Sequence, residues 1–225
     1  MQPCAAPPFS ADAPRVSDVR WRAHDLLRVT HLASSGDEPE WVRDAMRRAP
    51  WVVVRRSQAA EGFIAVGVRG ATRAQRFGAW INIQDVEVIL GPENLVDRTA
   101  APEREALPAF VALAMLRRTP SALGDFVWGP TGSAGFELAT QTGTLTESSD
   151  LDILIRTPRR LERPAIEALS QTLLLAASRA GTRIDAQLET PAGGVALAEL
   201  AAGKARVLAR ASSGAQLVAD PWRAP

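Results

Sequence analysis

Short apolar runs separated by turn-forming residues dominate the first half of the chain. One pair of runs flanks residues 57–62, a segment of turn composition, and predicts a β-hairpin. Two further runs follow before Gly91-Pro92 breaks the pattern. The four predicted strands are residues 51–54, 63–68, 79–83 and 86–90. The first half should therefore contain a small sheet, followed by one helix over residues 103–118, where apolar residues recur at helical spacing.

From residue 120 onward, strands alternate with helices. A strand at 126–128 leads into a glycine-rich turn, residues 129–135, and a short helix that begins at Phe136. A long helix follows later, with Pro164 in its first turn and Gly181 at its end. The strands on either side of that helix are predicted at residues 151–155 and 183–188.

These elements predict an α+β fold in three parts. Residues 1–17 are rich in Ala and Pro and read as a loose arm, and residues 18–119 form a smaller N-terminal α+β lobe. Residues 120–225 form the catalytic domain, a mixed sheet with helices. The composition agrees with a globular protein, since 46% of the 225 residues are hydrophobic and 23% are charged.

The charge balance and the cysteine count exclude several classes of function. The formal net charge is +1, so no global field would recruit nucleic acid or an anionic membrane. Cys4 is the only cysteine, which excludes an intrachain disulfide and a cysteine metal cage and favours a cytoplasmic location. No run approaches the roughly 18 apolar residues of a membrane span.

Two carboxylates, Asp150 and Asp152, stand two residues apart on the predicted strand at 151–155. Side chains at i and i+2 of a strand point to one face, so both acids should project together while the apolar residues between them pack inward. Such a pair repels itself unless a cation lies between the acids, and hard oxygen ligands favour Mg²⁺. The alternative is a solvated pair that caps a turn.

Three more residues are candidates for the same site. Gly132 would let an anion approach the backbone, and Ser133 can donate a hydroxyl beside a helix N-terminus, where phosphate binds. The segment lacks the lysine and the spacing of a P-loop, so a plain turn is the alternative. Asp185 follows Ile184 on the last predicted strand and should face the two other acids, unless it simply marks the solvated face of that strand.

Gly132-Ser133, Asp150-x-Asp152 and the later Asp185 together resemble the polymerase-β-like nucleotidyltransferase superfamily. In that superfamily a Gly-Ser turn holds nucleotide phosphates, and three carboxylates bind two Mg²⁺ ions. The 16 residues between Ser133 and Asp150 are more than the superfamily usually shows. An extra loop is therefore expected at residues 140–148.

A closer resemblance covers most of the chain and rests above all on the central segments GPTGSAGFELAT and LTESSDLDILIR. These segments, with RAHDLL near the start and Asp220-Pro221-Trp222 near the end, are similar to the malonate decarboxylase holo-acyl-carrier-protein synthases, the phosphoribosyl-dephospho-CoA transferases. In that family Asp150 and Asp152 match an essential aspartate pair.

The resemblance implies a nucleotidyltransferase that acts on a protein. It would transfer the phosphoribosyl-dephospho-CoA group from 2'-(5''-triphosphoribosyl)-3'-dephospho-CoA to a serine of the apo acyl carrier protein of malonate decarboxylase, with release of pyrophosphate. Asp150, Asp152 and Asp185 would bind two Mg²⁺ ions and carry the catalysis, and Gly132 and Ser133 would hold the departing phosphates.

Two other functions stay open. The chain could be an Mg²⁺-dependent nucleotidyltransferase that uses a nucleoside triphosphate, or an inactive binding module with the same fold. Lys204 and Arg210 are further candidates for phosphate binding, and Arg69, Arg73 and Arg76 for docking the carrier, but all five could equally be solvated surface charges.

Overall fold

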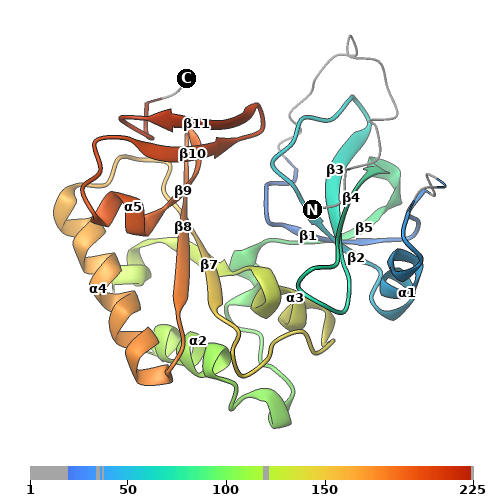
Figure 1. The fold of residues 1–225 in the computed structure, drawn as a ribbon, viewed down its shortest axis with the longest axis horizontal. Helices are drawn as coiled ribbons and strands as arrows, with labels where there is room; N and C mark the ends of the chain where they lie inside the picture. The colour runs from blue at the N-terminus through green and yellow to red at the C-terminus, as the bar shows by residue number, and fades with distance from the viewer. Residues whose placement is uncertain (1–19, 34–35, 37, 119–121, 224–225) are drawn as a thin grey trace. The chain divides into compact units, whose positions relative to one another are not determined.

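The chain folds as two compact α+β units, Met1–Gly91 and Pro92–Pro225 (Figure 1). The computed structural model describes residues 20–33, 36, 38–118 and 122–223. The predicted arm at residues 1–17 lies outside the described residues. No helix in the described part of the chain is both long and apolar enough to cross a bilayer.

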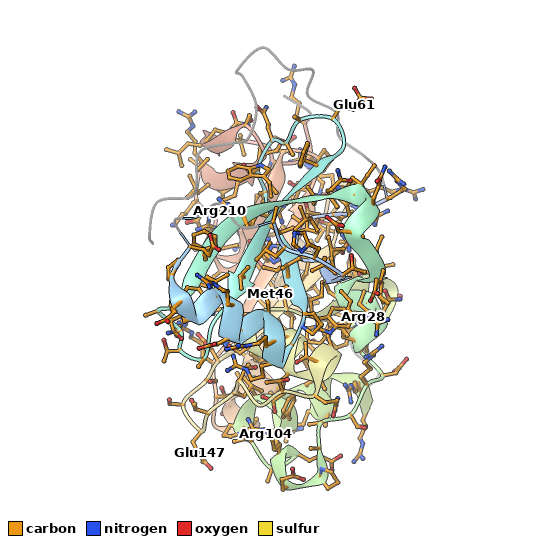
Figure 2. The ribbon with its side chains drawn as sticks, turned by 90° about the vertical axis from the view of Figure 1, so that its right-hand side faces the viewer. Arg28, Met46, Glu61, Arg104, Glu147 and Arg210 are labelled. Carbon is orange, nitrogen blue, oxygen red and sulfur yellow. The ribbon has the colours of Figure 1, made fainter. Side chains whose placement is uncertain are left out.

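Five strands of the described part of the first unit form one antiparallel sheet in the order β4-β3-β2-β1-β5. β2 and β3 form the predicted hairpin, with Val53 opposite Gly67. Val42 and Ala45 of α1 pack into the core of this unit, and Met46 of the same helix, labelled in Figure 2, packs at its edge. The elements are β1 (Leu26–Val29), α1 (Glu40–Arg48), β2 (Trp51–Val54), β3 (Phe63–Arg69), β4 (Arg76–Asn82), the 3₁₀ turn η1 (Ile83–Asp85) and β5 (Val86–Leu90).

The described part of the second unit contains a mixed sheet of six strands in the order β11-β10-β9-β8-β7-β6. β7 and β8 run parallel, which confirms the prediction that the strands at 151–155 and 183–188 share a sheet, and the other neighbours are antiparallel. The sheet strands are β6 (Val127–Pro130), β7 (Leu151–Arg156), β8 (Ile184–Thr190), β9 (Gly193–Ala196), β10 (Val207–Ala211) and β11 (Gly214–Val218).

The long helix α4 (Arg163–Ala180) connects the two parallel strands, as a crossover between parallel strands must. Leu169 of α4 is fully buried in the same cluster as Leu151, Ile153 and Ile155, the alternate residues of β7. Figure 1 shows α4 running alongside the sheet. The face of β7 that carries these aliphatic residues therefore packs in the core, and the opposite face carries Asp152 and Arg156 with the buried Leu154 between them.

The remaining elements of the second unit precede or flank the sheet. They are the 3₁₀ turns η2 (Pro92–Leu95), η3 (Pro102–Arg104) and η4 (Ala122–Asp125), and the helices α2 (Pro108–Arg118), α3 (Gly132–Thr140) and α5 (Leu197–Ala201). α2 begins at Pro108 rather than at residue 103, because proline lacks the N–H that an interior helical position would donate. The segment before it forms η3 instead.

The boundary between the two units lies at Gly91-Pro92, earlier than the predicted boundary at 119/120. The reason is that α2 packs within the second unit. Leu113 and Leu116 of α2 are buried in one cluster with Leu169 of α4. The sequence shows that α2 is amphipathic but does not show which sheet its apolar face will cover.

Candidate active site

The parallel pairing of β7 and β8 brings two of the predicted acids side by side. Asp152 is the register partner of Asp185, so their side chains leave the same face of the sheet. Asp150 lies immediately before β7 rather than within it, next to Leu151, whose N–H donates to the carbonyl of Arg183 at 2.9 Å. All three predicted carboxylates therefore lie near the N-terminal ends of β7 and β8.

A residue that sequence reasoning did not identify, Arg183, bridges two of these acids. Its Nη2 donates to Oδ2 of Asp150 at 2.5 Å and to Oδ2 of Asp185 at 2.8 Å. The Asp150 side chain is mostly buried, at 16% exposure, whereas that of Asp185 is about half exposed, at 51%. The hydrogen bond to Asp150 and the charge of Asp185 raise the pKa of Arg183 above its ordinary value.

The predicted Gly-Ser turn is the first turn of α3, which begins at Gly132 rather than at Phe136. Gly132 has φ +57°, and a Cβ at this position would lie 2.1 Å from Oδ2 of Asp152. The N–H of Thr131 also donates to the carbonyl of Asp152 at 2.9 Å. The first N–H groups of α3, which lack acceptors within the helix, therefore start directly beside the Asp152 carboxylate.

Residues 141–150 contain no helix or strand, so the extra loop predicted at 140–148 is present but begins one residue later, after α3 ends at Thr140. The buried carboxylate of Glu137 on α3 holds this loop, accepting hydrogen bonds from the N–H groups of Thr144 at 2.6 Å and Leu145 at 2.8 Å. It also forms a bidentate ion pair with Arg104, labelled in Figure 2, whose Nη2 donates to the carbonyl of Leu145 at 2.9 Å. The loop that leads to Asp150 is thus tied to α3.

We expect Glu137→Gln to lower the free energy of unfolding by about 1–3 kcal/mol, because it removes the charge that pairs with Arg104 and accepts the hydrogen bonds of the loop. Burial raises the pKa of the Glu137 carboxyl, but the hydrogen bonds from Arg104, Leu145 and Thr144 lower it further, so the net shift is downward. The carboxylate's contribution to stability is therefore present above the ordinary pKa of about 4.3 and lost as the pH falls through the lower pKa of the folded state.

Chemical denaturation at neutral and acidic pH measures this effect. The wild type should lose more stability than Glu137→Gln as the pH falls below about 4. Glu147→Gln is the matched control, since Glu147 lies in the same loop and is exposed (Figure 2). Equal acid sensitivity of wild type and Glu137→Gln would show that this carboxylate does not hold the loop.

The three acids have the donor chemistry that Mg²⁺ prefers. Two of them, Asp150 and Asp185, already share one cationic group, the guanidinium of Arg183. Within the described residues, no three His, Cys, Asp or Glu side chains are grouped tightly enough to hold a metal ion as they stand. Arg183 contacts one oxygen of each of Asp150 and Asp185, so an ion bound to these two acids would compete with it for their negative charge.

The other basic residues singled out in the sequence lie on other elements of the chain. Lys204 pairs with Glu199 at 3.2 Å. Arg210 lies on β10, and β9 and β8 separate that strand from β7. Arg69, Arg73 and Arg76 belong to the β3–β4 hairpin of the first unit.

Two segments that carry the family resemblance have structural contacts. Near the start of the described chain, the buried carboxylate of Asp25 accepts from the N–H of Arg22 at 2.7 Å and so closes a turn. Near its end, Asp220 pairs with Arg160 at 2.6 Å, and Nε1 of Trp222 donates to the carbonyl of Thr157 at 3.0 Å. The contacts of Asp220 and Trp222 hold the C-terminal segment against the segment that follows β7 in the second unit.

Comparison with known proteins covers both units. The model of the phosphoribosyl-dephospho-CoA transferase MdcG N-terminal domain matches residues 22–92, and that of the C-terminal domain matches residues 94–221. Phosphoribosyl-dephospho-CoA transferases from Pseudomonas aeruginosa and Azotobacter vinelandii are each 46% identical, over 203 and 205 residues, and each match covers 89% of this chain and 93% of the relative. The enzyme from Pseudomonas fluorescens strain Pf-5 is 42% identical over 203 residues, which cover 90% of this chain and 94% of the relative. No solved structure matches the chain.

The chain has two α+β units, and the second carries acids beside the glycine at the start of a helix. With the two matched family domains, these features define a two-domain class of transferases. The chain belongs to the phosphoribosyl-dephospho-CoA transferase family. The two family domains meet between residues 92 and 94, in agreement with the boundary between the units at Gly91-Pro92.

Proposed function

We propose that this chain transfers the phosphoribosyl-dephospho-CoA group from 2'-(5''-triphosphoribosyl)-3'-dephospho-CoA to a serine of the apo acyl carrier protein of malonate decarboxylase. The relatives' printed name supports the transferred group. The main structural support is the placement of Asp150, Asp152 and Asp185 beside the N-terminus of α3. The carrier and the release of pyrophosphate rest on the resemblance of the central segments.

In this reaction the serine oxygen forms a bond to the α-phosphorus of the precursor, and the bond from that phosphorus to pyrophosphate breaks. Asp185 is exposed enough to face the incoming hydroxyl and would accept its proton or ligate the metal nearer to it. The backbone at Gly132 and the hydroxyl of Ser133 would hold the departing phosphates. Two Mg²⁺ ions would be bound by Asp150, Asp152 and Asp185. These ions would neutralise charge on the leaving pyrophosphate.

Incubation of the chain with apo carrier protein, the triphosphoribosyl precursor and Mg²⁺, followed by intact mass measurement of the carrier, tests the proposal. We expect one added phosphoribosyl-dephospho-CoA group and no addition to a carrier whose acceptor serine is alanine. ATP or GTP in place of the precursor tests the alternative of a nucleotidyltransferase that uses a nucleoside triphosphate. A carrier unmodified by any of these donors would favour the inactive binding module.

The hairpin of β3 and β4 offers a candidate surface for an acidic carrier. Arg69 lies opposite Arg76, and Nη1 of Arg76 donates to the carbonyls of Thr72 at 3.3 Å and Gln75 at 3.1 Å. Arg73 lies in the exposed turn between the strands. Since the side chain of Arg76 bonds to the backbone of the turn and Arg73 is exposed in it, Arg73 is the residue chosen for reversal of charge.

We therefore expect Arg73→Glu to slow modification of the carrier about 3- to 10-fold at low salt, because reversal of a charge at the rim of an interface lowers the association rate. Added salt should slow the wild type more than the variant, since it screens the attraction that the variant has lost. The KM for the precursor should stay the same.

Initial rates at varied carrier concentration and salt measure this effect. Arg47→Glu, a reversal of an exposed arginine on α1 in the same unit, is the control and should behave as the wild type. A variant that instead loses affinity for the precursor while its affinity for the carrier is unchanged would make the hairpin a phosphate site.

A further inference from the structure

Arg183 occupies an unusual place for a surface arginine. A single nitrogen, Nη2, lies between carboxylate oxygens of two residues, one before β7 and one on β8. Its side chain is 67% exposed, so it does not contribute to the packing of the core. One cationic atom thus contacts two of the three acids that the sheet gathers at this end.

A positive group is needed at this place before any metal ion arrives. Three carboxylates on or beside two adjacent strands repel one another, and such repulsion destabilises the charged form or forces the side chains apart. Arginine keeps its charge at every physiological pH and is therefore a permanent counter-ion. A divalent ion that binds these carboxylates competes with the guanidinium, because both groups are positive, repel each other and are attracted to the same few oxygens.

We propose that Arg183 is the resident counter-ion of this carboxylate cluster, which it holds together before a divalent ion binds and from which that ion displaces it. The inference rests on the proposed metal site. In this role Arg183 is a positioning residue. It raises the stability of the metal-free fold, and it lowers the apparent affinity of the site for the ion.

The competing possibility is that Arg183 stays on Asp185 in the metal-loaded protein and aims that carboxylate at the ion. In that case its loss would weaken metal binding. The sign of the change in affinity therefore separates the two roles, and activity is not required as the readout.

Titration of the full chain with Mn²⁺, followed by the electron paramagnetic resonance signal of free Mn²⁺, measures this sign. We expect Arg183→Met to bind Mn²⁺ about 3- to 10-fold more tightly than the wild type, the range set by the loss of two ion pairs made by an exposed arginine. In chelator, Arg183→Met should melt at a lower temperature than the wild type, and saturating Mn²⁺ should raise its melting temperature by more. Arg183→Lys retains the charge and should give intermediate values.

Arg163→Met is the matched control, because it removes an exposed arginine that pairs with Glu167 on α4 of the same unit. Its affinity for Mn²⁺ should equal that of the wild type. Asp152→Asn, which leaves both contacts of Arg183 in place, should lose Mn²⁺ binding.

The outcomes separate this inference from the proposed function. Weaker or unchanged binding of Mn²⁺ by Arg183→Met, with binding lost in Asp152→Asn, overturns the counter-ion role alone and leaves the metal site standing. Absence of Mn²⁺ binding by the wild type, or equal binding by Asp152→Asn, overturns the proposed metal site and the counter-ion role together.

Discussion

Asp152→Asn is expected to abolish group transfer while the chain stays folded. Asp152 is the acid that touches the start of α3 and is the register partner of Asp185, so it would link the metal to the phosphates. Loss of several kcal/mol of charge stabilisation corresponds to a fall in kcat of about 1000-fold or more. Thermal melting without Mg²⁺ should show unchanged or raised stability, because the variant removes one of three mutually repelling charges.

The rate of carrier modification and the melting temperature of the same preparation test this expectation together. Asp125→Asn, which neutralises an exposed acid at the end of η4 in the same unit, is the control and should keep its activity. Asp150→Asn should also abolish transfer, but it removes an ion pair to Arg183 as well, so its stability is a less direct measure of repulsion. Near-normal transfer by Asp152→Asn would remove this residue from the catalytic group.

Gly132→Ala is expected to cost at least about 100-fold in transfer, since a shift of about 1 Å in a reacting group can have an effect of that size. The added methyl group would lie 2.1 Å from Oδ2 of Asp152, so the carboxylate or the helix start must move. The positive φ of +57° adds strain for any residue with a Cβ, and we expect a loss of about 1–3 kcal/mol in the free energy of unfolding.

Gly181→Ala is the control for the backbone-strain part of this effect, so the difference between the two variants is the steric part. Gly181 ends α4 with φ +68°, close to the value at Gly132, but a Cβ there would meet no atom within 4 Å. It should therefore cost about 1 kcal/mol of stability with no loss of transfer. Full activity in Gly132→Ala would show that transfer does not depend on the close approach of Asp152 to the start of α3.

The elements with strong local signals could be predicted from the sequence. β2 and β5 have the predicted bounds, and α4 begins with a proline in its first turn and ends at a glycine as expected. β1 and α1 were not predicted, nor were β9, α5, β10 and β11. Each of these spans nine residues or fewer, and the four strands among them lack a continuous run of β-branched and aromatic residues such as the WVVV of β2.

The sequence by itself determined the α+β class, the strand that carries Asp152 and the candidate acids, because each depends on local alternation and on the types of adjacent residues. The tertiary structure decided which unit α2 joins, where α3 begins, and that Arg183 bridges Asp150 and Asp185. Arg183 lies 33 positions from Asp150 in the chain. A contact over that distance depends on the register of β7 against β8, and register is set by the packing of the whole sheet and not by either strand alone.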